Sequence, residues 1–178
     1  IETYLSSLPG DIGFYYKNLV NGQQYVFNEK QAFVAASVIK IPVMMGIFDK
    51  VEKGLISFDN TIEIRQADKV PSCGIVTFLH EGCTLTVKDL CYLMIVISDN
   101  TATNLLIKNF AGIDEVNAIL ANHGIGETRL NRLLFDEQKK AQGIENYFSP
   151  KEMGILLEMM EKGELISKKA SRSMLEIL

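Results

Sequence analysis

The sequence has little of what marks metal-binding or disulfide-rich proteins. Its 178 residues include three cysteines, two histidines and four prolines. Three cysteines without a Cys-x-x-Cys spacing leave at least one thiol free or paired outside the chain. His80 and His123 do not stand at ligand spacing to a cysteine, so we expect no zinc site, no other metal and no cofactor. Cys91 lies on the apolar stripe of an expected helix and is interpreted as a buried structural thiol, whereas Cys73 and Cys83 are left unassigned.

The chain also lacks an excess of positive charge and a long apolar run. Its formal charge of −4 gives no electrostatic footprint for nucleic acid or an anionic membrane. A membrane span needs roughly 20 apolar residues. The most apolar stretch, Tyr92–Ile97, is ended by Ser98-Asp99-Asn100. The remaining composition, 47% hydrophobic and 22% charged, is typical of a globular protein with a sizeable core.

No repeat, low-complexity tract or Pro/Gly-rich linker divides the sequence, so residues 1–178 are expected to form one domain. The first residue is Ile1 rather than Met, which indicates a mature product, a trimmed piece or a fragment from which a signal peptide could have been removed. The residues leave the oligomeric state open.

Residues 1–30 are predicted to form a sheet subdomain, with a helix over 1–8 and a hairpin of strands 11–20 and 23–28. Ile12, Phe14 and Tyr16 alternate on one face of the first strand. Asn21-Gly22 predicts a two-residue type I′ turn, which needs positive φ at both residues.

Residues 37–165 are predicted to be mostly helical, and 167–178 to start a helix that returns to the sheet. The apolar stripes are expected to be buried on two helices: Ile39, Val43, Ile47 and Val51 on one, and Leu90, Leu93, Met94 and Ile97 on the other. Start signals stand at Thr86 with Asp89, at Ser149-Pro150 with Glu152 reaching back to the cap, and at Ser167. Residues 130–149 have no clear period and are interpreted as a functional or Ω-type loop.

The fold class that follows is α/β of the α+β type: an antiparallel sheet flanked by helices, plus an all-helical subdomain. Two strands alone make a poor sheet. We therefore expect further strands from residues that this chain does not contain.

Ser37-x-x-Lys40 places a serine at a helix start and a lysine on the same face one turn later. A serine hydroxyl becomes a good nucleophile when a nearby base, such as a desolvated lysine, takes its proton. The helix N-terminus also directs backbone N–H groups toward a developing oxyanion. The alternative is simple capping, since one such spacing arises by chance in roughly every chain of this size.

Ser98-Asp99-Asn100 ends one helix and begins another, which puts polar side chains at a junction that can face a cleft. Asp99 or Asn100 could merely cap the following helix. A specified tripeptide occurs by chance in only a few per cent of such chains. Its order and separation from Ser37 therefore favour a shared catalytic function.

The two motifs in this order resemble those of class A β-lactamases and penicillin-binding proteins, whose signature is Ser-x-x-Lys, Ser-Asp-Asn and Lys-Thr-Gly. The similarity extends to the stretches SVIKIPVMM, GLISFDNTI, LTVKDLCYLMIVISDNTATNLLI and LNRLLFDEQ…NYFSP. The resemblance implies that Ser37 is the acylated nucleophile and that Lys40 activates it. Ser98 would relay a proton to the leaving nitrogen, Asn100 would bind substrate, and Asp99 would be structural.

The sequence departs from the family pattern in two places. No Lys-Thr-Gly occurs, so we expect that part of the site, on a further strand, to lie outside this chain. The Glu-x-x-Leu-Asn pattern of the deacylating glutamate is also absent. Asp136 and Glu137 are the nearest carboxylates after Leu130-Asn131-Arg132, and either is otherwise a solvated loop charge. Without a positioned base, hydrolysis of the acyl-enzyme would slow by about a hundredfold to ten-thousandfold.

Three functions remain open. The first is hydrolysis of β-lactams through an acyl-serine. The second is a penicillin-binding or D-Ala-D-Ala peptidase-like protein that deacylates slowly and takes a peptide-like amide as substrate. The third is a non-catalytic β-lactam sensor module. Export to the periplasm or the cell exterior follows only from the resemblance, and the residues do not decide between export and the cytoplasm.

Overall fold

The structure is a computed structural model of the chain and describes residues 1–71 and 74–178. Cys73, one of the two cysteines left unassigned, lies outside the described residues. The strands of the described part pair as β1–β2, β3–β6 and β4–β5, all antiparallel. They are β1 (Phe14–Lys17), β2 (Gln24–Phe27), β3 (Phe33–Val34), β4 (Thr61–Glu63), β5 (Thr84–Thr86) and β6 (Tyr147–Phe148).

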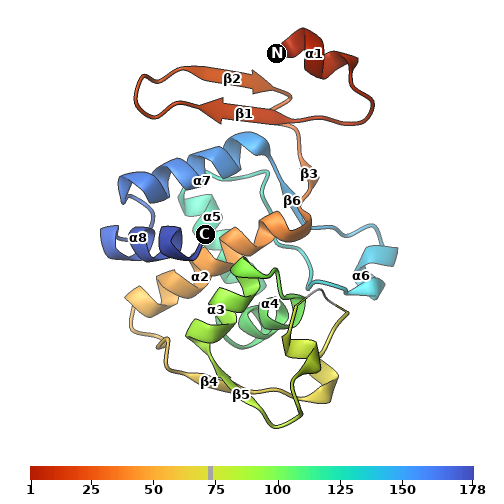
Figure 1. The fold of residues 1–178 in the computed structure, drawn as a ribbon, viewed down its shortest axis with the longest axis vertical. Helices are drawn as coiled ribbons and strands as arrows, with labels where there is room; N and C mark the ends of the chain where they lie inside the picture. Colours follow the sequence, from red (N-terminus) through yellow and green to blue (C-terminus); the bar gives the residue numbers. More distant parts are fainter. Residues whose placement is uncertain (72–73) are drawn as a thin grey trace.

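Helices make up most of the remaining structure (Figure 1). The α-helices are α1 (Glu2–Ser7), α2 (Lys40–Glu52), α3 (Val87–Val96), α4 (Asn100–Leu106), α5 (Ile113–Asn122), α6 (Glu137–Ala141), α7 (Pro150–Lys162) and α8 (Lys168–Ile177). Shorter helical turns are η1 (Ala36–Ile39), η2 (Gln66–Asp68), η3 (Val76–Phe78) and the π-helical η4 (Ile107–Ala111). The described chain contains no helix of the length and apolarity that crossing a membrane requires.

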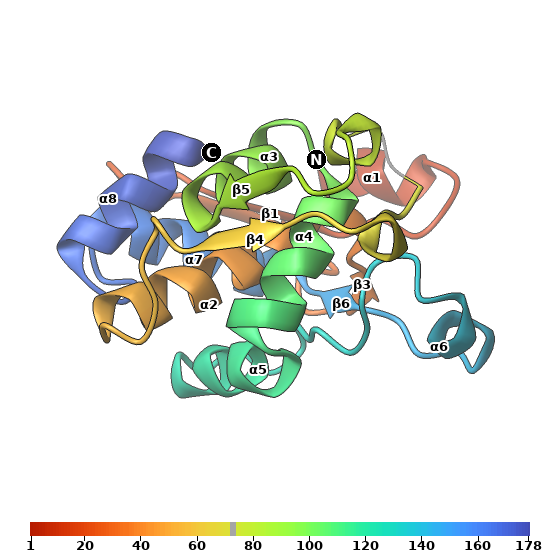
Figure 2. The ribbon, with the colours of Figure 1, turned by 90° about the horizontal axis from the view of Figure 1, so that it is seen from below.

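Helix α2 is the centre of the core. It packs against α3, α4, α5 and α8, as Figures 1 and 2 show from two directions. Ile39, Val43 and Ile47 of its predicted stripe are fully buried. At Gly46 the neighbouring helix α5 approaches so closely that a Cβ would lie 2.8 Å from Cγ2 of Val116. The core thus holds Lys40, the first residue of α2, and the preceding turn η1, which contains Ser37.

The predicted hairpin is present, but the predicted two-residue turn is wrong. The strands are joined by residues 18–23, and Oδ1 of Asn18 accepts hydrogen bonds from the N–H groups of Val20 (2.9 Å) and Asn21 (3.2 Å). This side-chain turn replaces a type I′ turn. Positive φ is needed only at Gly22 (75°) and not at Asn21.

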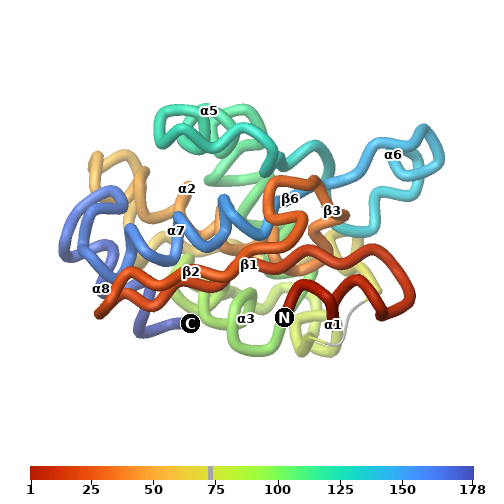
Figure 3. Tube along the Cα trace, turned by 90° about the horizontal axis from the view of Figure 1, so that it is seen from above, coloured from red at the N-terminus to blue at the C-terminus, as the bar shows by residue number. Residues whose placement is uncertain are grey.

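The hairpin lies across α7 (Figure 3). The ring of Tyr15 contacts Gly154 of α7, where a Cβ would meet the ring at 2.3 Å, and Lys17 pairs with Glu158 at 2.6 Å. Tyr16, on the opposite face, stays 43% exposed. Tyr15 and Lys17 therefore attach the hairpin to α7, and Tyr16 does not.

Most of the predicted helix starts are present. Thr86 and Asp89 form a complete capping box at α3, and the Ser167 hydroxyl accepts from Ala170 N–H at α8. Ser149 caps α7, but the prediction that Glu152 reaches back to it is wrong. The Glu152 carboxylate instead accepts hydrogen bonds from loop residues 126–128, which offer three backbone N–H groups and one hydroxyl.

The predicted buried face of α3 is correct for Leu90 and Met94 and wrong for Ile97, which is 40% exposed. Ile97 lies beyond the last helical residue, where the chain leaves the helix with φ of −117°. The pairs β3–β6 and β4–β5 and the short helix α6 were not predicted, because two to five residues carry too little periodicity. The predicted α+β class, a helix-rich fold with small antiparallel sheets, is confirmed.

Candidate active site

Ser37 lies in the 3₁₀ turn η1 that leads directly into α2. Its hydroxyl makes no capping bond at this helix start; it lies 2.8 Å from the hydroxyl of Ser98. The preceding residue, Ala36, has a left-handed φ of 44°, a conformation that residues other than glycine adopt rarely. The alternative that Ser37 simply caps the helix is therefore wrong.

Lys40 is the first residue of α2 and only 2% exposed. Its Nζ donates to the Ser98 carbonyl at 2.7 Å, to the Ser98 hydroxyl at 2.8 Å and to Oδ1 of Asn100 at 2.8 Å. A buried amine needs such partners, because burial without hydrogen bonds costs several kcal/mol, on the order of 2–7 even for a neutral polar group. These contacts fix the position of Nζ at the junction between α3 and α4.

That junction is held by Asp99, which is fully buried. One carboxylate oxygen accepts from Val76 N–H at 2.8 Å and the other caps α4 through Ala102 N–H at 2.9 Å. Ser98 is held between the two helices with a left-handed φ of 57°. The structural role expected for Asp99 is thus seen directly: it orients the turn that presents Ser98 and Asn100.

The structure brings together all four residues singled out from the sequence, Ser37, Lys40, Ser98 and Asn100. A hydroxyl, a second hydroxyl and an amine follow one another at hydrogen-bond distance, and the first hydroxyl is exposed to solvent. Such a chain can accept the proton of an attacking serine and deliver it to a leaving group. The arrangement is a serine–lysine cluster in which Ser98 lies between Ser37 and Lys40.

The segment after Leu130 forms one wall of the site. It is a compact loop whose ends meet: Arg132 Nε pairs with Glu145 at 3.1 Å, and the Asn146 side chain bonds the backbone of residues 131 and 132. This agrees with the predicted Ω-type loop. Within the loop, Leu134 is held by Asn104 of α4. The Asn104 Oδ1 accepts from the Leu134 N–H and the Asn104 Nδ2 donates to the Leu134 carbonyl, each at 2.9 Å.

The loop and the serine border an open hollow of about 240 Å³. It is lined by Ala36, Ser37, Asn100, Arg132, Leu134, Phe135, Glu137 and Lys140. The two loop carboxylates differ here. Asp136 caps α6 by accepting from Lys139 N–H at 3.0 Å, whereas Glu137 faces the hollow and is an exposed side chain 4.0 Å from Lys140. Of the two, Glu137 is therefore the one that borders the serine's cleft.

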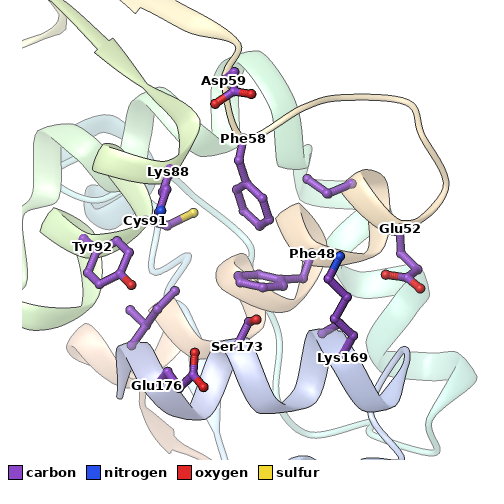
Figure 4. A pocket seen from close by; sticks show the side chains of 13 residues that line it. Phe48, Glu52, Phe58, Asp59, Lys88, Cys91, Tyr92, Lys169, Ser173 and Glu176 are labelled. Atoms are coloured by element: carbon purple, nitrogen blue, oxygen red, sulfur yellow. The ribbon is translucent and has the colours of Figure 1, made fainter.

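A larger hollow of about 400 Å³ lies away from these residues, between the far end of α2, α3 and α8 (Figure 4). The rings of Phe48 and Phe58 meet edge to face at 4.9 Å on its floor, and lysines and acidic residues mix on its rim. Cys91 borders it as a buried thiol, as predicted, and burial raises its pKa to about 12. This hollow contains none of the four site residues.

Sequence reasoning missed Asn104 and Phe135. Asn104 lies on α4 one turn after Asn100. Residues four apart share a helix face, so this spacing could have predicted that Asn104 faces the same side as Asn100. Phe135 carried no signal in a segment without periodicity.

Comparisons with known proteins identify the family of the chain. The family described as the β-lactamase enzyme family matches residues 1–178, and the chain belongs to it. The resemblance to class A enzymes is likewise confirmed. β-Lactamase CARB-3 of Pseudomonas aeruginosa is 28% identical over 163 residues, which cover 91% of this chain and 56% of that protein. The chain thus spans about half the length of the curated relatives it matches.

Solved structures share the fold. A β-lactamase of Sphaerobacter thermophilus DSM 20745 has a TM-score of 0.82 and 36% identity, covering 88% of this chain and 58% of that one. PBP-A has a TM-score of 0.88 and 28% identity, covering 98% and 64%. A PBP-A mutant has been solved as an acyl-enzyme complex with penicillin G.

Proposed function

We propose that this protein opens β-lactam and related amide bonds through a covalent acyl-serine, with Ser37 as nucleophile. The single observation that carries the proposal is the unbroken chain from the Ser37 hydroxyl to the Ser98 hydroxyl and on to Lys40 Nζ, with 2.8 Å at each step. Membership of the β-lactamase enzyme family supports the substrate class. By the same membership, we propose that the protein is exported.

In this mechanism the Ser37 oxygen attacks the carbonyl carbon while its proton passes to the amine form of Lys40, directly or through Ser98. The backbone N–H of Ser37 stabilises the oxyanion. The carbon–nitrogen bond then breaks, and the nitrogen takes its proton from the Ser98 hydroxyl, which Lys40 reprotonates. Acyl-Ser37 results, and the amine form of Lys40 is regenerated once the proton has been passed on. Asn100 contacts Nζ and borders the cleft, a position from which its side chain can also bind substrate.

A second candidate is a penicillin-binding or peptidase-like protein whose acyl-enzyme persists. The wall facing Ser37 favours it, since Leu134 and Phe135 are apolar and Asp136 is committed to capping α6. Glu137 is exposed and pairs with Lys140 at 4.0 Å, and this contact does not direct its carboxylate toward a water at the ester. The structural similarity to PBP-A agrees with this candidate.

Mixing the full-length protein with a chromogenic cephalosporin, followed by intact-mass measurement, tests both. Continuous turnover indicates a hydrolase. One equivalent of colour and a mass increase on the Ser37 peptide indicate the slow-deacylating protein. No colour change together with no mass increase would refute both candidates and leave only a non-catalytic binding module. Ser37→Ala is expected to abolish modification, and Ser7→Ala, at an exposed serine on α1, is the matched control.

A further inference from the structure

We propose that Phe135 sets the substrate preference of the site by binding an aromatic or apolar group on the acyl side of the scissile amide. The inference rests on the proposed acylation of Ser37 and adds the kind of substituent that the cleft selects.

The first argument is the backbone at Phe135, which has a left-handed φ of 59°. This conformation is unfavourable for a bulky residue and persists where the surroundings enforce it. Here both neighbours are fixed: Leu134 is held through its N–H and carbonyl by Asn104, and Asp136 begins α6 as its cap. Strained residues of this kind cluster at ligand-binding positions.

The second argument is the side chain. Leu134 is buried, whereas Phe135 remains 46% exposed while it lines the hollow that contains Ser37. Burial in the core therefore does not account for a phenylalanine in this conformation. The loop that carries it is closed by Arg132 and Glu145, so the backbone at Phe135 is held before any ligand arrives. An aromatic side chain on a fixed backbone loses less entropy on binding than one on a flexible loop.

The third argument concerns the direction of the hollow. The leaving nitrogen must lie near Ser98, because Ser98 gives it a proton. Ser98 is absent from the lining of this hollow, which runs from Ser37 and Asn100 to the 132–140 segment. A group attached to the acyl carbon therefore extends toward Phe135. An aromatic substituent gains offset or edge-to-face contact there, in addition to burial of apolar area. Of the charged groups in the lining, Glu137 and Lys140 lie 4.0 Å apart with opposite charges, and Arg132 is paired with Glu145. The hollow therefore does not require a charged substituent.

The test compares two β-lactams with the same nucleus. Benzylpenicillin carries a phenylacetyl group on the acyl side, and 6-aminopenicillanic acid has none. Acylation rate constants are measured with the full-length protein and with Phe135→Ala, Phe135→Leu and Phe135→Gly. We expect Phe135→Ala and Phe135→Gly to slow acylation by benzylpenicillin about five- to twentyfold and to change acylation by 6-aminopenicillanic acid less than twofold. Phe135→Leu should retain part of the preference.

The glycine variant separates the ring from the strain, because glycine adopts positive φ freely. Tyr16→Ala, at an aromatic residue of similar exposure on β1, is the control and should change neither rate. Equal loss with both substrates in folded variants, or no loss with either, would overturn the inference. If neither compound acylates the protein without substitutions, the proposed function itself is refuted, and the inference with it.

Discussion

Lys40 donates to both the hydroxyl and the backbone carbonyl of Ser98, at 2.8 Å and 2.7 Å. The carbonyl contact fixes Nζ regardless of how the hydroxyl rotates. The hydroxyl can therefore exchange protons with Lys40 on one side and Ser37 on the other without moving the amine. This separation of positioning from proton transfer allows the two functions to be tested independently.

Ser98→Ala removes the relay and leaves the carbonyl contact in place. We expect acylation of Ser37 to slow by about a hundredfold to ten-thousandfold, the usual contribution of general acid–base catalysis. The free energy of unfolding should change little, since Lys40 keeps two acceptors. Rapid-mixing measurements with a chromogenic cephalosporin check the rate, and thermal unfolding checks the fold. An acylation rate within threefold of the unmodified protein would show that Lys40 works without Ser98.

The local signals of this sequence were reliable where the interaction is local. Thr86 and Asp89 are three residues apart, and their capping box formed as predicted. Asn21-Gly22 is also local, but a stronger local bond competed with it, because the Asn18 side chain took the N–H groups that the expected turn would have left free. Glu152 was predicted to bond the cap of its own helix, but its carboxylate accepts hydrogen bonds from a loop that lies 24 to 26 residues earlier in the chain.

The site divides in the same way. The spacing of Ser37 and Lys40 was informative only together with Ser98 and Asn100, whose motif follows in the expected order. The wall of the cleft could not be predicted, because the contact that builds it joins Asn104 to Leu134 across 30 residues. Nothing in residues 130–149 indicates that Phe135 is held in a strained, half-exposed conformation.

Asp99→Ala should destabilise the protein by about 2–4 kcal/mol. The change leaves the buried N–H groups of Val76 and Ala102 without an acceptor, at about 1–3 kcal/mol for an unsatisfied group, and removes a helix cap. Asp99→Asn keeps one acceptor oxygen and should lose roughly half as much. Urea unfolding measures both. Asp59→Ala, at an exposed aspartate, is the control, and an equal small effect at both positions would contradict the role of Asp99.

Cys91 should resist alkylation in the folded protein. Burial raises the pKa of its thiol to about 12, so the reactive thiolate is a minute fraction near pH 8. Iodoacetamide followed by peptide mapping should modify half-buried Cys83 well before Cys91. In denaturant the two should react at similar rates. Rapid labelling of Cys91 without denaturant would show that the packing of α3 against α2 opens readily.

The last prediction concerns stability in acid and Glu152. Burial raises the pKa of this carboxyl, but the hydrogen bonds from the N–H groups of Glu127 and Gly126 and from Thr128 outweigh it, and the net pKa is lowered. A carboxyl whose folded-state pKa lies below its unfolded value stabilises the fold above the unfolded value, about 4.3. That contribution is lost as the pH falls through the folded pKa.

Glu152→Gln should therefore lower the free energy of unfolding at pH 7, and the difference from the protein without substitutions should shrink as the pH falls below about 4. Urea unfolding as a function of pH measures this difference. Glu161→Gln, at an exposed position of α7, is the control, and a difference that stays constant down to pH 3 would contradict the role assigned to Glu152.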